Sequence, residues 1–197
     1  MTEQQTAFWE AIDVFDKEGL LPYVMLIGSW AEYIYQFHLK SEFKANLKTR
    51  DVDFLYPNLN RPKASDIKII KGLSEKGFVY KEDYMSGVGK FIKEDLLELE
   101  FITRALGKGQ SINEIPSLNI KAEGLRVVNM LADYPLELDC NNFIITVPEP
   151  EAYIPANTAA QKWSKGASLL SPQETCRWRS LSFIQKQSLK RRVLLLR

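Results

Sequence analysis

Two aspartates one residue apart, Asp51 and Asp53, interrupt a segment whose other residues are typical of a β-strand. Aspartate is depleted in strands because its short side chain competes for nearby backbone hydrogen bonds. Residues two apart in a strand face the same side, with their Cα atoms about 6.6 Å apart. The pair therefore predicts a strand that presents two carboxylates on one face and points Val52 into the opposite layer.

A second pair of acids follows in residues 96–103, where charged and apolar residues alternate. The alternation predicts a strand with Glu98 and Glu100 on one face and apolar side chains on the other. Carboxylates that met on neighbouring strands would repel one another without a cation between them. Oxygen ligands of this kind suit Mg²⁺, and two such ions can assist an in-line phosphoryl transfer.

Upstream, an apolar run of strand length at residues 23–28 leads directly into Gly28 and Ser29. Helical spacing then predicts a helix over residues 30–39, with Ser29 as its N-cap and Glu32 completing a capping box. Glycine lets a ligand approach the backbone, and the first N–H groups of a helix favour a phosphate. The unit is consistent with a phosphate site, although a Gly-Ser turn alone is also common between a strand and a helix.

The remaining chain predicts further elements of both kinds. Apolar spacing favours helices over residues 6–18 and 63–76. Two hairpins are predicted, one around Ser86-Gly87 and one around Asn141-Asn142.

Three segments together, 26-LIGSW-30, 51-DVD-53 and 97-LELEF-101, resemble the nucleotidyltransferase superfamily related to DNA polymerase β. That superfamily combines an apolar residue with Gly and then Gly or Ser, an Asp-x-Asp strand, and a third acid on a following strand. The similarity covers about residues 20–150 and is greatest to bacterial and archaeal nucleotidyltransferases of a group similar to the AbiEii type of toxin.

The resemblance implies a fold and a reaction. The fold is an α/β (α+β) domain with a small mixed β-sheet flanked by helices. The reaction moves a nucleoside monophosphate from an NTP to a hydroxyl acceptor. The implied site residues are Asp51, Asp53 and Glu100 as catalytic ligands of Mg²⁺ or Mn²⁺, and Gly28 and Ser29 as contacts of the NTP.

The third acid leaves alternatives open. Glu100 is preferred to Glu98 because apolar residues follow it, as in the family, but glutamate stands where aspartate is commoner. The longer side chain shifts the metal position, so a catalytically silent nucleotide-binding module is one alternative. A toxin–antitoxin-type component acting on RNA or protein is another, and the acceptor could be RNA, a protein or a small molecule.

Composition restricts the class of protein and of metal site. The 45% hydrophobic and 26% charged fractions are those of a globular protein, and no apolar run approaches the roughly 20 residues that cross a bilayer. Acids near the N-terminus argue against a signal peptide, so we expect a cytoplasmic protein without a membrane partner. Cys140 and Cys176 have no second thiol or histidine at metal-ligand spacing, so a metal site must use oxygen ligands.

Charge divides the chain near residue 156. Residues 157–197 contain nine Lys or Arg and the single acid Glu174, a net of +8, whereas residues 1–156 carry a net of −7. We therefore expect a nucleotidyltransferase domain over residues 1–156 and a basic C-terminal segment over residues 157–197. A basic tail could bind nucleic acid, but a shifted reading frame would produce an equally abrupt change of composition.

Overall fold

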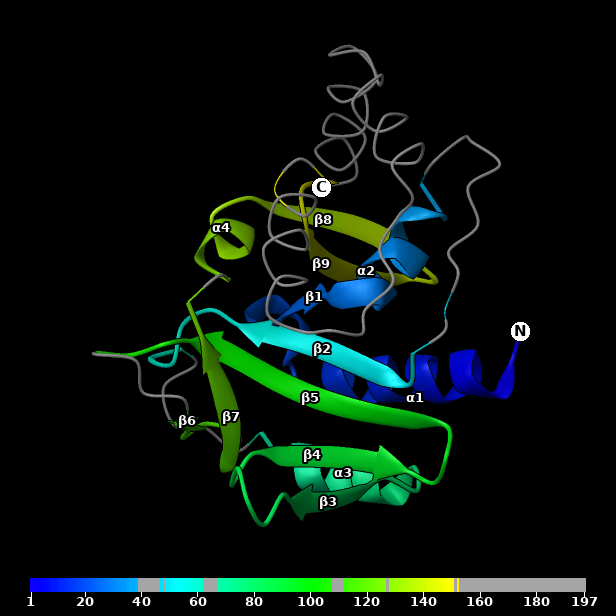
Figure 1. Cartoon of the computed structure of the whole chain (residues 1–197). Coiled ribbons are helices and arrows are strands. Elements are labelled where there is room, and N and C mark those ends of the chain that lie inside the picture. The colour runs from blue at the N-terminus through cyan, green and yellow to red at the C-terminus, as the bar shows by residue number, and fades with distance from the viewer. Residues whose placement is uncertain are drawn as a thin grey trace.

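The computed structural model describes residues 1–38, 47, 49–61, 67–107, 112–126, 128–150 and 152. The elements in chain order are α1 (Glu3–Lys17), η1 (Leu21–Tyr23), β1 (Met25–Ile27), α2 (Gly28–Tyr35), β2 (Asp51–Tyr56), α3 (Ile69–Glu75), β3 (Val79–Glu82), β4 (Gly89–Lys93), β5 (Leu97–Arg104), β6 (Ile112–Ile115), β7 (Ile120–Leu125), α4 (Asn129–Ala132), β8 (Pro135–Cys140) and β9 (Phe143–Pro148). They form a seven-stranded mixed sheet and a separate two-stranded sheet made by β8 and β9 (Figure 1).

Strand β5 is the centre of the larger sheet. It pairs in parallel with β2 along one edge. Along its other edge, β4 pairs antiparallel with residues 97–100 and β7 pairs in parallel with residues 102–104. Strands β1 and β3 extend the sheet beyond β2 and β4, and β6 pairs with β7. One face of β5 therefore brings together side chains from four strands.

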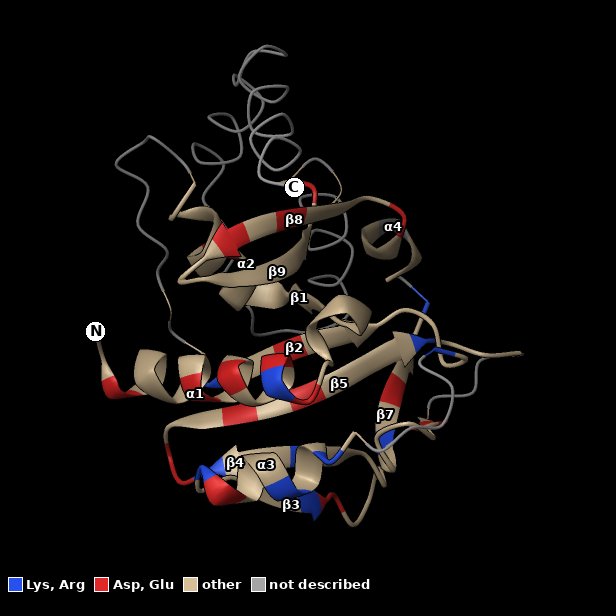
Figure 2. Ribbon diagram, turned by 180° about the vertical axis from the view of Figure 1, so that it is seen from behind, with Lys and Arg blue, Asp and Glu red and all other residues tan. Residues whose placement is uncertain are grey.

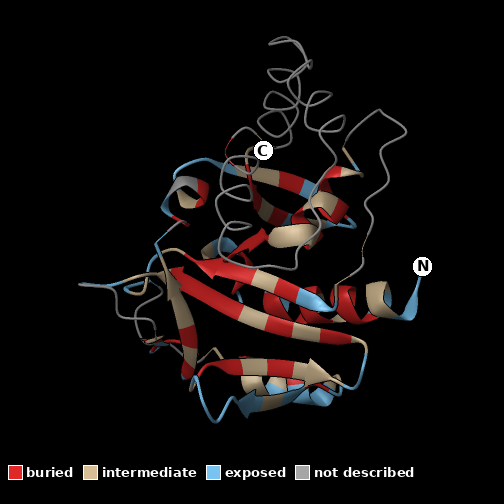
Figure 3. Cartoon of the chain, in the orientation of Figure 1, coloured by how far each residue is buried: buried red, intermediate tan, exposed pale blue. Residues whose placement is uncertain are grey.

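The main core lies between the sheet and the two helices α1 and α3, which cover the face seen in Figure 2. Phe15 of α1 packs against Phe54 and Phe101, with ring centroids 4.8 and 5.9 Å apart. Each such buried side chain stabilises the fold by roughly 1.5–3 kcal/mol relative to an exposed one. Over residues 97–101 of β5, buried residues alternate with partly buried ones (Figure 3), because the opposite face of the strand carries the acids.

The predicted α/β architecture with a mixed sheet flanked by helices is confirmed. Both predicted hairpins form, as β3 with β4 and as β8 with β9. The first helix starts earlier than predicted because Thr2 and Gln5 form a capping box. The predicted helix over 63–76 is shorter, running from residue 69 to 75, and residues 62–66 lie outside the described part. Strands β6 and β7 and the short helix α4 were not predicted.

Two predictions concern the chain as a whole. Residues 157–197, with Cys176, lie outside the described residues, so the domain boundary at residue 156 stays a prediction. In the part of the chain with described placement, no helix is long and apolar enough to cross a membrane.

Candidate functional site

The two acidic strands lie side by side in register. In the parallel pair of β2 and β5, Asp51 is opposite Glu98 and Asp53 is opposite Glu100. Directly opposed residues share one face of a sheet, as do residues two apart in a strand. All four carboxylates therefore lie on the face of the sheet opposite α1 and α3. The intervening residues, Val52 among them, are buried in the main core.

Three of these acids have a donor set suited to a divalent cation. Carboxylate oxygens of Asp51, Glu98 and Glu100 all lie within 4.8 Å of one another. Opposite ligands of Mg²⁺ are about 4.2 Å apart, since each Mg–O bond is about 2.1 Å, so small side-chain shifts would close this group around an ion. Glu98, the alternative to Glu100 as third acid, thus belongs to the same group as Glu100.

Asp53 lies next to the turn between β1 and α2. Ile27 is its partner in the antiparallel pair of β1 and β2, and Gly28 follows with φ of +67°. A Cβ atom on Gly28 would lie 2.6 Å from the Asp53 Oδ2 atom. Glycine is therefore required here twice, for its left-handed backbone and for the space that the carboxylate occupies.

Ser29 does not cap the following helix, so the predicted capping box with Glu32 is wrong. Helix α2 starts at Gly28 with Ile27 as N-cap, and no side chain of the described residues caps it. The hydroxyl of Ser29 instead shares a hydrogen bond of 2.7 Å with the hydroxyl of Thr49. This bond ties the start of α2 to the segment entering β2, beside the first acid. The contact of Ser29 with a nucleotide stays a prediction.

The charges on this face are strongly coupled. Burial, followed by the Glu100 and Asp51 carboxylates, raises the pKa of Asp53 to about 7. On β7, burial and then Glu100 raise the pKa of Glu123. Burial and the neighbouring negative charges thus both raise these two pKa values, and a bound cation would lower them again. Lys90 of β4 lies next to these acids, with its Nζ atom 2.5 Å from Glu100 Oε1.

Sequence reasoning missed Lys90 and Glu123 as neighbours of the site. Lys90 belongs to the fragment 87-GVGK-90, which forms part of the predicted hairpin of β3 and β4. Its place opposite Glu100 depends on the pairing of β4 with β5. Glu123 lies opposite Ile102 on a strand that was not predicted. Alternation in residues 120–125 was an available signal for that strand, but nothing local indicated its partner.

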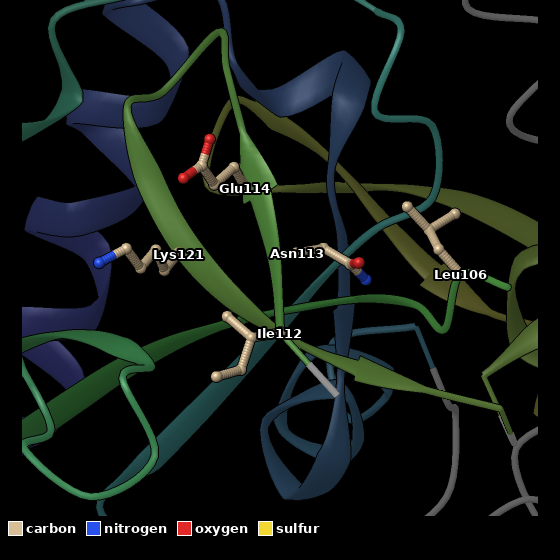
Figure 4. Close-up of a pocket in the computed structure, with 5 residues that line it drawn as sticks. All are labelled: Leu106, Ile112, Asn113, Glu114 and Lys121. Carbon is tan, nitrogen blue, oxygen red and sulfur yellow. The ribbon is translucent and has the colours of Figure 1, made fainter. Parts of the chain in front are cut away.

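A pocket of about 430 Å³ lies along β6 and β7 (Figure 4). The Asn113 amide there donates from Nδ2 to Thr103 Oγ1 at 2.7 Å and to the Arg104 carbonyl at 3.1 Å. Asn113 therefore ties β6 to the end of β5. The residues that line the pocket are Leu106, Ile112, Asn113, Glu114 and Lys121, and none of the predicted site residues is among them.

Comparisons with known proteins find a matching family and similar structures. A family model described as "Nucleotidyltransferase" matches residues 7–162. The crystal structure of ANT(2″)-Ia in complex with adenylyl-2″-tobramycin is similar over 98% of this chain and 99% of that chain, with a TM-score of 0.52 and 13% identity. The lincomycin-bound lincosamide antibiotic adenylyltransferase LnuA is similar over 92% and 99%, with a TM-score of 0.44 and 15% identity. Comparison with curated protein sequences finds no match.

Proposed function

The chain belongs to the nucleotidyltransferase family, and from that membership we propose that it transfers a nucleoside monophosphate from an NTP to an acceptor hydroxyl with Mg²⁺ or Mn²⁺. One observation carries the proposal: four carboxylates of two neighbouring strands lie on one face of the sheet, beside a glycine turn that opens a helix. Such a face is costly without a cation and has the donor chemistry that a Mg²⁺–triphosphate complex needs.

Asp51, Asp53 and Glu100 are the proposed metal ligands, and Glu98 lies within reach of the same ion. The close oxygens of Asp51, Glu98 and Glu100 support this assignment. Asp53 supports it through its coupling to both Glu100 and Asp51. When bound, the metal lowers the charge on the phosphate oxygens and favours ionisation of the attacking hydroxyl.

Gly28 and Ser29 are the proposed contacts of the triphosphate. The start of an α-helix is in general favourable for phosphate oxygens, because its first N–H groups and its dipole favour negative charge. Gly28 has no side chain, so the Asp53 carboxylate can lie against the backbone at the start of this helix. The hydrogen bond between the hydroxyls of Ser29 and Thr49 fixes the orientation of this turn relative to β2. These residues would therefore orient the NTP with its phosphates over the carboxylates.

The reaction is a displacement at the α-phosphorus. A bond forms between the acceptor oxygen and this phosphorus while the bond to the pyrophosphate oxygen breaks. The hydroxyl proton passes to a carboxylate of the acidic face or to water. The contribution of the protein is orientation and charge balance, which account for most catalysis of phosphoryl transfer.

The acceptor class is tested most directly by competition among candidates. The similar structure of ANT(2″)-Ia contains an adenylylated aminoglycoside, so hydroxyl-bearing small molecules belong among the candidates, together with tRNA and the protein itself. Each would be incubated with Mg²⁺ and an NTP labelled at the α-phosphate. Transfer of label to one class, with release of pyrophosphate, would identify it.

The proposal as a whole is tested by Asp53→Asn, which removes a charge and almost no volume. We expect transfer to fall about a hundredfold or more while the fold is kept, because a metal-site carboxylate is lost. The matched control is Asp13→Asn on α1, which lies on the opposite face and pairs with Lys17. Activity of Asp53→Asn within about tenfold of the control would contradict the assignment.

A further inference from the structure

Lys90 of β4 forms ion pairs with two acids of β5. Lys90 is opposite Glu100 in the pairing of β4 and β5. Its Nζ atom lies 2.5 Å from Glu100 Oε1 and 3.7 Å from Glu98 Oε2. The exposed fractions of the three side chains are 32% for Lys90, 24% for Glu98 and 17% for Glu100, so the pairs are partly shielded from water.

The ammonium group uses the same acids that suit a divalent ion. Glu98 and Glu100 belong, with Asp51, to the group whose oxygens lie within 4.8 Å of one another. A carboxylate oxygen that accepts a hydrogen bond from Lys90 is less available to a metal, and the ammonium and a divalent cation repel each other at this range. Lys90 and a metal ion therefore compete for this part of the face.

We propose that Lys90 is a positioning residue that holds Glu98 and Glu100 in the nucleotide-free chain and makes binding of the divalent cation depend on the NTP. The inference rests on the proposed function of this face. An ion arriving alone meets a site that Lys90 already neutralises. An ion arriving with a triphosphate brings negative charge that the Lys90 ammonium can bind instead. The affinities for metal and nucleotide are then coupled, and the coupling is reciprocal.

If the ion pair of Lys90 with Glu100 had only a structural role, the outcome would be different. If Lys90 only joined β4 to β5, its removal would lower stability and leave metal affinity unchanged or weaker. If it competes with the ion, its removal must strengthen binding of the metal alone. The chain offers a matched control in Lys81, which lies opposite Lys90 on β3 and is exposed. Lys81→Met removes the same charge from the neighbouring strand.

The test measures Mn²⁺ binding to the full chain by electron paramagnetic resonance, without nucleotide, for the wild type, Lys90→Met, Lys90→Arg and Lys81→Met. We expect Lys90→Met to bind Mn²⁺ about tenfold or more tightly than the wild type, because one positive charge is removed from beside the carboxylates that would hold the ion. Lys90→Arg keeps the charge and Lys81→Met keeps Lys90, so both should bind like the wild type. With an NTP present, the gain of Lys90→Met should disappear.

Two results would overturn the inference in distinguishable ways. If the wild type binds Mn²⁺ together with an NTP but Lys90→Met gains no affinity for Mn²⁺ alone, Lys90 does not compete and the proposed function stands. If neither protein binds Mn²⁺ with or without an NTP, the proposed function fails and the inference fails with it. Should Lys90→Met not fold, Lys90→Gln replaces it, because the amide can still donate to Glu100 without the charge.

Discussion

Gly28 lies directly against the Asp53 carboxylate, and this packing leads to a prediction for one substitution. Gly28→Ala places a Cβ atom 2.6 Å from Asp53 Oδ2 at a φ of +67°. We expect a loss of about 1–3 kcal/mol in the free energy of unfolding from strain and displacement. Because the carboxylate must move, binding of Mn²⁺–NTP should weaken as well. Denaturant unfolding and Mn²⁺ titration measure the two effects.

Gly19 supplies the control for Gly28. It has nearly the same φ, +68°, but a Cβ atom there would have no other atom within 4 Å. Gly19→Ala therefore reports backbone strain alone, about 1–2 kcal/mol, and should leave Mn²⁺–NTP binding unchanged. Equal losses of stability and equal metal affinity in the two variants would show that the contact of residue 28 with Asp53 affects neither stability nor metal binding.

The raised pKa of Asp53 predicts how the metal-free protein responds to pH. Burial and the nearby Glu100 and Asp51 carboxylates raise this pKa from 3.8 to about 7. The folded chain then holds a proton that the unfolded chain has lost. The free energy of unfolding should therefore fall as pH rises from about 4 to about 7 and should level off above that range. Denaturant unfolding in the presence of a chelator, at a series of pH values, measures this slope.

Asp53→Asn isolates the contribution of this one group. The amide does not titrate, so the variant should lose the part of the slope that belongs to Asp53 and should gain stability relative to the wild type mainly at neutral pH. If the two proteins showed parallel profiles between pH 4 and pH 7, the folded chain would not hold the proton on Asp53.

At the scale of elements, the hairpin of β8 and β9 depends on its two-residue turn. Asn141 and Asn142 have φ values of 51° and 68°, which match the type I′ turn that suits twisted hairpins. Asn142→Ala should lower the free energy of unfolding by about 1 kcal/mol, because alanine is strained at positive φ. Asn142→Gly should keep or raise it, since glycine is favoured at this position. Thermal unfolding of the two variants measures the difference, and equal midpoints would contradict the turn assignment.

The sequence was sufficient for elements whose pattern is local. Alternation in residues 96–103 and the aspartate pair predicted β5 and β2, and turn residues predicted both hairpins. The resemblance implied a third acid on a following strand, but the parallel pairing of β2 with β5 was not predicted. The local capping prediction at Ser29 was wrong because Thr49, twenty residues away, forms the hydrogen bond with its hydroxyl. The capping box that does form, at Thr2 and Gln5, carries the expected spacing and could have been found.

What the sequence did not indicate depends on pairing between distant segments. Strand β5 pairs with β4 over its first half and with β7 over its second half. These two pairings bring Lys90 and Glu123 towards the acids. Neither pairing is encoded in a local pattern, because β-strand partners are chosen by packing over the whole sheet. The ion pairs of Lys90 with Glu98 and Glu100 were therefore visible only in the folded chain.

At the scale of the whole molecule, the two faces of the large sheet differ in composition and burial. One face is covered by α1 and α3 and provides most of the apolar core. The other carries the acids and a smaller apolar cluster of Met25, Ile27, Leu55, Ile102, Val128 and Leu131. Separation of this kind lets charge gather on one face without unpaired carboxylates in the main core. It predicts that the acidic face can be altered with little loss of fold.

The last prediction concerns residues 157–197, whose net charge is +8. The proposed contacts of metal and NTP all lie on α2, β2, β4 and β5, and the described core continues to Ala152, which is 6% exposed. We therefore expect a chain shortened to end at Ala156 to stay folded and to bind Mn²⁺–NTP like the full chain. A second shortened chain would end at Lys162, where the family match ends. Comparing the two chains distinguishes an effect of losing residues 157–162 from an effect of losing the rest of the tail.

Binding of a nucleic-acid acceptor is the property that the tail should affect. Lysine and arginine contacts to phosphates weaken steeply with salt. If the acceptor is RNA, the full chain should bind it more tightly than either shortened chain at low salt, and the difference should shrink as salt rises. If the chain ending at Ala156 folds but loses Mn²⁺–NTP binding, the tail belongs to the nucleotide site and the proposed division at residue 156 is wrong. If it does not fold while the chain ending at Lys162 does, the domain extends to the end of the family match, and the basic segment begins only beyond it.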